Sequence, residues 1–159
     1  MILITLGTQD KKFTRLLNNV QECIDEGKIK EEVIVQAGYT KFKSKDMQIF
    51  DLIEREKFQD LIRKCDLLIT HGGVGSIITG LQNNKKVIVC PRLAKFDEHM
   101  NDHQLQITKN FAKSGYILPF YEQDDLSKII ENSKNFKPKK FTSNTNNIIK
   151  IVSEYIDEN

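Results

Sequence analysis

The sequence has 159 residues, of which 39% are hydrophobic and 29% are charged, and its formal net charge at pH 7 is +2. A chain of this length and composition is typical of one soluble globular domain with a substantial core. The small net charge gives no strong attraction to polyanions, so nucleic acid is not expected as a partner.

Strands and helices are predicted to alternate along the chain. Runs of apolar and β-branched residues indicate strands, and apolar residues repeated every three or four positions indicate helices. In chain order we expect a strand at 1–6, a helix at 13–26, strands at 32–36 and 47–50, a helix at 54–64, a strand at 66–70, a helix at 73–83, a strand at 86–90, a helix at 101–113, a strand at 116–118 and a helix at 125–133. A basic loop at 134–140 and a terminal amphipathic helix at 144–156 complete the prediction.

This alternation predicts an α/β fold. Strands that are apolar throughout are buried on both faces, as in a Rossmann-like, mostly parallel sheet with helices on both faces. The sequence contains no internal repeat and no convincing linker. Residues 1–159 are therefore expected to form a single domain, with 144–156 as its last helix.

The cysteines and the first residues bear on the cellular compartment. Cys23, Cys65 and Cys90 lie in apolar segments, as buried free thiols do, which favours a reducing cytoplasm. The first ten residues lack the basic segment of a signal peptide. No apolar run approaches the roughly 20 residues that span a bilayer.

The stretch THGGVGS at 70–76 follows a predicted strand, and the next helix is expected to begin inside it. A helix N-terminus presents unpaired N–H groups, and glycine lets an anion approach them closely, so this loop favours phosphate. Ser76 and His71 could each add a hydrogen-bond donor. The alternative is a tight turn whose glycines serve only packing. The spacing matches neither the dinucleotide fingerprint nor the P-loop.

Two further glycine turns follow predicted strands. The first, TLGT, contains Gly7 and Thr8, and the second, VQAGYT, contains Gln36 and Gly38. The carboxyl ends of parallel strands share one edge of a sheet, where ligands bind. We therefore expect all three turns to line one cleft.

A polar stretch at 89–106 is rich in side chains that bind hydroxyl groups. A sugar needs such a mixture of donors and acceptors. The alternative is a solvated loop in which Asn101 or Asp102 caps a helix. The side chains concerned are Asp97, Glu98, His99, Asn101, Asp102, His103 and Gln104.

The histidines of this stretch leave a second class of function open. His99 and His103 are four residues apart, and Asp97, Asp102 and His71 could join them at distances suited to zinc. A metal-dependent hydrolase using the three histidines is therefore an alternative, although the sequence has no HExxH motif.

Taken in order, TLGT, VQAGYT, THGGVGS and PRLAKFDEHMNDHQLQ resemble the C-terminal, donor-binding half of glycosyltransferase family 28, which has the GT-B fold. The resemblance extends from Met1 to about Ile130. The resemblance is closer to small stand-alone members of the family than to its full-length enzymes. These are the catalytic subunit of the two-piece N-acetylglucosaminyl-diphosphodolichol synthase and the PssE-type subunits of bacterial capsule and exopolysaccharide synthesis.

The resemblance implies a UDP-sugar donor site without a metal or other cofactor. The glycine cluster would hold the diphosphate beside His71, with Gly7 and Thr8 facing the same cleft. The polar stretch would hold the sugar. One departure is Thr79, which stands where related transferases carry a glutamate that binds the ribose. The implied donor-binding residues are Gly7, Thr8, Gln36, Gly38, Gly72, Gly73, Gly75, Ser76, Thr79, Asn101, Asp102 and Gln104.

The resemblance also implies an inverting transferase that works with a second chain. A membrane-anchored partner subunit would supply the acceptor domain, and the acceptor would be a lipid-linked sugar. The chain would be cytoplasmic and recruited to the inner face of the membrane. His71 would assist the leaving UDP, and the general base would be His99, His103 or a residue of the partner. An accessory subunit that binds nucleotide sugar without chemistry of its own is the alternative that Thr79 favours.

Overall fold

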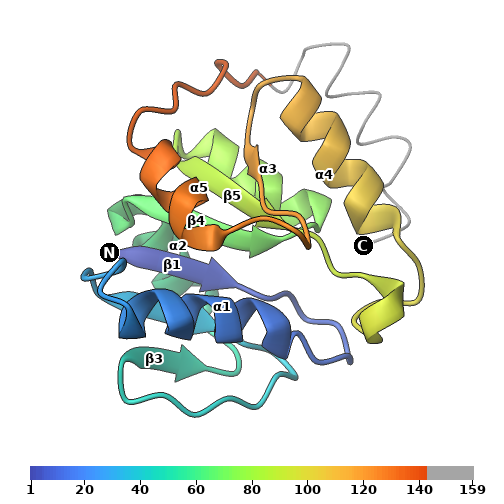
Figure 1. Cartoon of the computed structure of the whole chain (residues 1–159). Coiled ribbons are helices and arrows are strands. Elements are labelled where there is room, and N and C mark those ends of the chain that lie inside the picture. Colours follow the sequence, from blue (N-terminus) through green and yellow to red (C-terminus); the bar gives the residue numbers. More distant parts are fainter. Residues whose placement is uncertain (143–159) are drawn as a thin grey trace.

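The structure, a computed structural model, describes residues 1–142, and the helix predicted at 144–156 lies outside the described residues. Its centre is a sheet of six strands in the order β3-β2-β1-β4-β5-β6, and all five neighbouring pairs are parallel (Figure 1). The predicted parallel sheet is therefore confirmed. The strands are β1 (Ile2–Thr5), β2 (Val33–Gln36), β3 (Met47–Phe50), β4 (Leu67–His71), β5 (Lys86–Cys90) and β6 (Leu118–Pro119).

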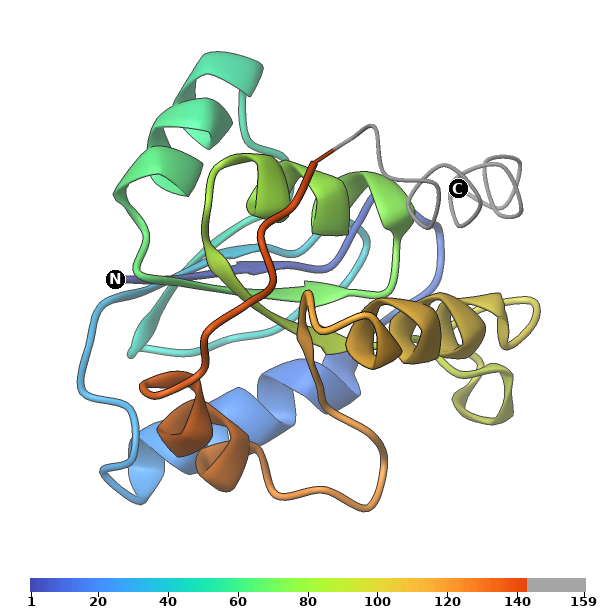
Figure 2. The same cartoon turned by 90° about the horizontal axis from the view of Figure 1, so that it is seen from above.

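Helices cover both faces of the sheet, as predicted. One face carries α1 and α5, and the other carries α2 and α3 (Figures 1 and 2). Ile107 and Phe111 of α4 join the same core cluster as the buried residues of α2 and α3. The helices are α1 (Thr14–Asp25), α2 (Arg55–Lys64), α3 (Val74–Gln82), α4 (His103–Lys113) and α5 (Leu126–Ser133), with a short 3₁₀ helix, η1, at Ala94–Phe96.

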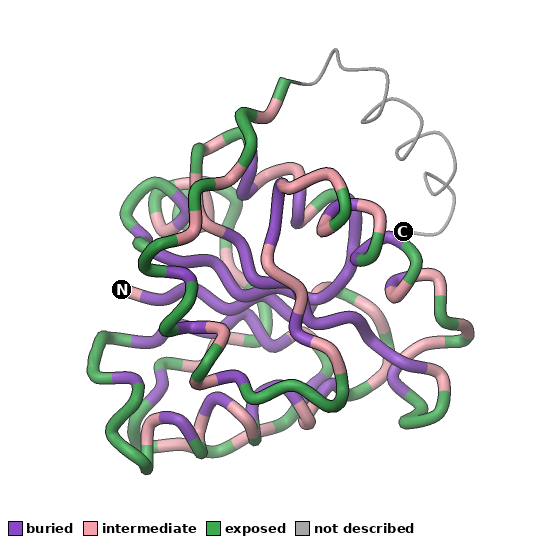
Figure 3. Tube along the Cα trace, turned by 45° about the horizontal axis from the view of Figure 1, so that its top comes forward, coloured by how far each residue is buried: buried purple, intermediate pink, exposed green. Residues whose placement is uncertain are grey.

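The core forms two layers, one on each side of the sheet. Successive side chains of a strand point to opposite faces, so Ile4 of β1 packs in the layer under α1 and α5, whereas Leu3 packs in the layer under α3. Every residue of β1, β2 and β4 is buried, and Figure 3 shows this burial continuing through the middle of the molecule. Burial on both faces explains why these strands read as continuous apolar runs.

All three cysteines are buried and free. Burial raises the pKa of the Cys90 thiol to about 12 and that of Cys23 to about 11. These thiols therefore stay protonated and pack as small apolar side chains.

The strand order reverses between β1 and β4. From β1 the chain builds outward through β2 and β3, then crosses back to add β4, β5 and β6 on the other side. In open parallel sheets, ligands bind outside the carboxyl ends of the strands at such a reversal. Gly7 lies just beyond the end of β1, and His71 ends β4. Two of the three predicted glycine turns therefore meet at this point.

The polar stretch differs most from the prediction. The helix expected from residue 101 begins at His103, and η1 was not predicted. Asn101 Oδ1 accepts a hydrogen bond from the His103 N–H at 3.0 Å, and Asp102 Oδ1 accepts one from the Ala94 N–H at 2.9 Å. Short polar side chains that bond the nearby backbone in this way compete with helix formation.

The last strand is also shifted. Tyr116 and Ile117 are buried in the core, and the pairing with β5 is made by Leu118 and Pro119 instead of residues 116–118. Among residues 1–142, no helix combines the length and apolarity needed to cross a membrane.

The glycines of α3 give a stability test. A Cβ at Gly80 would lie 2.7 Å from Leu68 Cδ2 and 2.8 Å from Val87 Cγ2. The helix α3 can therefore pack this closely on β4 and β5 only because residue 80 has no side chain. We expect Gly80→Val to lower the free energy of unfolding in urea by about 2 kcal/mol through overpacking.

The matched control is Gly75→Ala, five residues earlier in the same helix. A Cβ there meets nothing within 4 Å, so this change should raise the free energy of unfolding by about 0.5–1 kcal/mol. A Gly80→Val protein as stable as the parent would show that α3 can move off the sheet.

Candidate functional site

A cavity of about 340 Å³ opens at the carboxyl ends of β1 and β4. Seven of the residues predicted from the sequence line it. They come from all three glycine turns and are Gly7, Thr8, Gln36, His71, Gly73, Gly75 and Ser76. The prediction that these turns share one edge of the sheet is therefore confirmed.

Part of the lining was not predicted from the sequence. Leu52, Ile53 and Phe58 form an apolar wall, and Thr5 and Gln9 complete the cavity. Leu52 is 72% exposed and belongs to the rim of the cavity that solvent reaches. The pattern around residue 52 is that of an ordinary strand-to-helix loop, so no local signal distinguished it.

The His71 ring is packed between two glycines. A Cβ at Gly7 would lie 2.8 Å from both Cε1 and Nε2 of His71, and a Cβ at Gly73 would lie 2.9 Å from Nε2 and closer still to Cε1. Gly7 also has a φ of +86°, which favours glycine. These two glycines are therefore required by the imidazole that lies against them.

The third turn supports the first. Gly38, with a φ of +57°, brings its backbone so close to the Gly7 carbonyl that a Cβ would collide with it. The Gln36 amide donates to the Gly7 carbonyl at 3.0 Å and accepts from the Gly7 N–H at 3.3 Å. Gln36 therefore lines the cavity while it holds the Gly7 turn, and Gly38 lies behind that turn, outside the lining.

His71 is buried and neutral. Its Nδ1 lies 3.1 Å from the Gln104 amide nitrogen, and its Nε2 lies 3.4 Å from the Ser76 hydroxyl. Burial, reinforced by the charge of Arg92, lowers the pKa of His71 from 6.5 to about 3. The ring can offer one N–H group and one lone pair, and it carries no charge at neutral pH.

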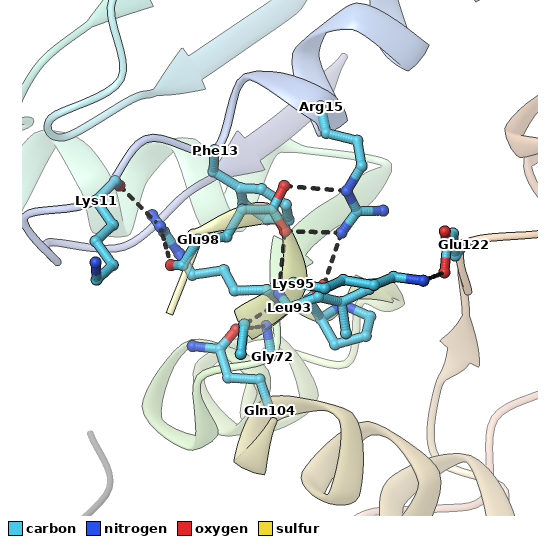
Figure 4. Close-up of polar contacts among 12 residues, drawn as sticks. Lys11, Phe13, Arg15, Gly72, Leu93, Lys95, Glu98, Gln104 and Glu122 are labelled. Carbon is cyan, nitrogen blue, oxygen red and sulfur yellow. Dashed lines mark hydrogen bonds and ion pairs between the residues drawn. The ribbon is translucent and has the colours of Figure 1, made fainter. Parts of the chain in front are cut away.

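Gln104 is expected from the resemblance to hold the sugar, but the structure gives its amide internal partners. The side chain is 2% exposed, and its oxygen accepts from the Gly72 N–H at 2.9 Å and the Arg92 N–H at 3.1 Å (Figure 4). A Cβ at Gly72 would lie 2.8 Å from Gln104 Cβ. Gly72 therefore serves close packing on α4, and neither residue lines the cavity.

The buried Arg92 is a second feature that the sequence analysis missed. It is 1% exposed, and its guanidinium donates to the carbonyls of Leu6 at 2.5 Å, Lys11 at 2.8 Å and Glu98 at 3.0 Å. Burial lowers its pKa to about 10, with the Glu98 charge opposing that shift, so it remains protonated at neutral pH. Arg92 thus ties the turn after β1 to the loop after β5.

Glu98 belongs to the same internal network. Its carboxylate is 3% exposed and accepts two hydrogen bonds from Arg15, each of 3.0 Å (Figure 4). It also accepts from the Leu93 N–H at 3.0 Å. These charge-assisted hydrogen bonds hold the carboxylate against Arg15 and the Leu93 backbone, away from the cavity.

The remaining predicted residues lie outside the cavity lining. The His99 ring accepts from the Asn101 N–H at 3.3 Å, and the Thr79 hydroxyl donates to the Gly75 carbonyl at 2.8 Å. These bonds are local, and they leave the expected sugar and ribose contacts as predictions. The predicted residues that do not line the cavity are Gly38, Gly72, Thr79, His99, Asn101, Asp102, His103 and Gln104.

The zinc alternative has no site in the described part of the chain. Residues 1–142 contain no group of three or more histidine, cysteine, aspartate or glutamate side chains placed to hold a metal ion. His71 faces Gln104 and Ser76 instead of the other two histidines. The hydrolase hypothesis that required all three histidines around one ion therefore lacks its geometry.

The arrangement is suited to an anion beside a flat apolar group. The cavity contains the first turn of α3, where backbone N–H groups and the positive end of the helix dipole favour negative charge. Within residues 1–142 the lining includes no carboxylate that would repel an anion. The wall of Leu52, Ile53 and Phe58 could cover the face of a ring. Phosphate attached to an aromatic base meets both requirements.

The family model of the glycosyltransferase family 28 C-terminal domain matches residues 1–158. The chain is 33% identical over 112 residues to the UDP-N-acetylglucosamine transferase subunit ALG13 of Candida albicans, covering 70% of this chain and 36% of that protein. It is 44% identical over 62 residues to the protein of the same name from Saccharomyces cerevisiae, covering 38% and 29%. The chain thus spans about a third of the length of these relatives.

Solved structures support the fold. An NMR solution structure of ALG13 superimposes with a TM-score of 0.61 at 21% identity, covering 98% of this chain and 96% of that one. The glycosyltransferase SnogD from Streptomyces nogalater gives a TM-score of 0.52 at 15% identity, covering 99% of this chain and 43% of that one. The predicted Rossmann-like half of a GT-B fold is confirmed by this likeness.

The neutral state of His71 predicts a pH dependence of stability. Because its pKa falls from 6.5 to about 3 on folding, the unfolded chain binds a proton below pH 6.5 that the folded chain does not. Stability should therefore be lost progressively as the pH falls from about 6.5 to about 3, by up to about 1.4 kcal/mol per pH unit from this residue.

The measurement is urea denaturation of the parent and of His71→Gln at several pH values in that window. The variant keeps a neutral polar side chain without the titration, so the difference between the two slopes isolates His71. Parallel slopes would mean that the ring takes up its proton in the folded state.

Proposed function

The chain belongs to the glycosyltransferase family 28 C-terminal domain family, and we propose that it is the UDP-sugar-binding, catalytic subunit of a two-chain inverting glycosyltransferase. The observation that carries the proposal is the cavity at the reversal of strand order, lined by bare backbone at the start of α3. The donor we propose is UDP-N-acetylglucosamine, because the relatives from both yeasts are named for its transfer.

The diphosphate would lie against the first turn of α3. Gly75 and Ser76 line the cavity there, and the Ser76 hydroxyl oxygen lies 3.4 Å from Nε2 of the His71 ring. Backbone N–H groups at a helix start bind phosphate without further charge. Gly7 and Thr8 would bound the diphosphate from the β1 side.

The uracil base would lie toward the apolar wall. Leu52, Ile53 and Phe58 are the apolar members of the lining, and they come from the loop after β3 and from α2. An apolar wall with a few polar groups is the usual composition of a small-molecule site. Thr79 lies further along α3 than the lining residues Gly75 and Ser76. The expected ribose contact at Thr79 would therefore require the nucleotide to extend beyond the cavity along this helix.

Transfer would follow an in-line displacement at the sugar. The acceptor oxygen forms a bond to the anomeric carbon while the bond from that carbon to the β-phosphate oxygen breaks, and the electron pair leaves with UDP. Donors aimed at the developing charge lower the barrier, and one such donor contributes about 3 kcal/mol. Ser76, His71 and the N–H groups of the α3 start would be these donors.

The acceptor proton must pass to a general base. His99 and His103 do not line the cavity, which favours a base from the partner. That partner would be membrane-anchored and would present a lipid-linked sugar, with this chain held at the cytoplasmic face of the membrane through it. The expected similarity to PssE-type subunits finds no support among the relatives described above.

Nucleotide binding tests the donor site. Gly75→Leu should lower the affinity for UDP, measured by isothermal titration, at least tenfold, because the side chain would occupy the anion position. The fold tolerates the change, since a Cβ at Gly75 meets nothing within 4 Å.

Gln82→Leu, at the exposed far end of the same helix, is the control and should bind UDP as the parent does. No heat from UDP or from any UDP-sugar with the parent chain would count against the donor site itself.

A transfer assay tests the need for a partner and the catalytic role. The tagged chain would be isolated from its own organism both as a membrane complex and as the purified single chain. Each would be given labelled UDP-N-acetylglucosamine and extracted membrane lipid. We expect label to enter lipid only with the complex, and the complex containing Gly75→Leu to lose most of this transfer.

Full transfer by the single chain would contradict the partner requirement. Full transfer by the variant complex would make this chain an accessory subunit, with the donor bound elsewhere.

A further inference from the structure

We propose that Gln104 is a positioning residue that holds His71 in the tautomer with its proton on Nε2, so that the ring presents a donor to the cavity. The part of this inference that concerns the ligand rests on the proposed function. The part that concerns the ring stands on hydrogen bonds within the chain.

The orientation of the Gln104 amide follows from its neighbours. One end of the amide lies 2.9 Å from the Gly72 nitrogen and 3.1 Å from the Arg92 nitrogen. Both are backbone N–H groups, which only donate, so the atom that faces them is the acceptor oxygen. The opposite orientation would place NH₂ against two N–H groups in a site that is 2% exposed.

The tautomer of His71 follows from the amide. With its oxygen engaged, Gln104 can turn only its NH₂ group toward His71 Nδ1, at 3.1 Å. That nitrogen must therefore accept. A neutral imidazole carries one proton, and burial keeps this ring neutral, so the proton is on Nε2.

The protonated nitrogen is the one at the cavity. Nε2 lies 3.4 Å from Ser76 Oγ, and both residues belong to the cavity lining. A ring turned over would place a carbon instead of Nδ1 opposite the Gln104 NH₂ group, so the hydrogen bond to Gln104 determines which way the ring faces. An N–H group at this place can donate to a phosphate oxygen, whereas a lone pair would repel it. Gln104, which is not part of the cavity lining, thus determines whether the ring attracts or repels a phosphate oxygen there.

The test exchanges the donor end of the amide for an acceptor. In Gln104→Glu, one carboxylate oxygen can still accept from Gly72 and Arg92, while the other faces Nδ1 and draws the proton there. The matched control is Gln106→Glu, which adds the same charge at an exposed position of the same helix.

The first measurement is long-range ¹H–¹⁵N correlation of the histidine rings in the full chain, with His71→Gln identifying the His71 signals. We expect a pyridine-type Nδ1 and a pyrrole-type Nε2 in the parent and in Gln106→Glu, and a pyrrole-type Nδ1 in Gln104→Glu. A pyrrole-type Nδ1 in the parent, or unchanged ring nitrogens in Gln104→Glu, would overturn the inference. This readout needs no ligand, so it remains decisive even if UDP does not bind.

The second measurement is UDP affinity between about pH 6 and pH 8, taken as the ratio of variant to parent so that titration of UDP cancels. At low pH the His71 ring of Gln104→Glu carries both protons and still donates from Nε2. As the pH rises, the proton on Nε2 is lost, and the ratio should fall by about tenfold or more. A low ratio at every pH supports the proposal if Nδ1 of the variant is pyrrole-type, and with unchanged ring nitrogens it would show a merely structural role and overturn the proposal. A ratio near one at pH 8 with a pyrrole-type Nδ1 would overturn the part that concerns the ligand, and Gln106→Glu should give a ratio near one.

Discussion

A buried guanidinium holds the site together. Arg92 donates to carbonyls from the turn after β1 and from the loop after β5, segments that lie far apart in the sequence. A buried charge is costly unless hydrogen bonds replace its water. Three carbonyls do so at the two terminal nitrogens of Arg92, while its buried Nε has no hydrogen-bond partner within residues 1–142. This side chain therefore helps to shape the part of the cavity formed by the turn after β1, which the Gln36 amide also holds. Its charge also helps to keep His71 neutral.

The glycines of the site matter because they have no side chain. His71 can sit at the end of β4 only because Gly7 and Gly73 leave room for its ring, and Gly72 leaves room for Gln104. The glycines of the cluster therefore do different work. Gly72 and Gly73 make space for internal contacts, and Gly75 leaves open the surface on which an anion can lie. A count of glycines in the sequence does not separate these roles.

The sequence predicted the parts of the molecule that depend on local patterns. Burial on both faces of the sheet produces apolar runs, and parallel strands bring their carboxyl ends to one edge, so the strands and the cavity could both be predicted. The polar stretch could not be interpreted in the same way. Glu98 and Gln104 have the groups that bind a sugar, but here they bond Arg15, Leu93, Gly72 and Arg92. Donors and acceptors satisfy backbone as well as ligand, and only long-range contacts decide between them.

The ring wedged between two turns has a consequence for how this sequence can change over time. Any side chain larger than hydrogen at position 7 or 73 collides with the imidazole, and a smaller residue at 71 leaves a hole between the two bends and an amide at 104 without its neighbour. Each step taken alone is harmful, although a joint replacement could be harmless. The four positions are thus expected to drift as one unit, with strong epistasis among them, while the exposed Gly75 is free to vary as far as the ligand permits.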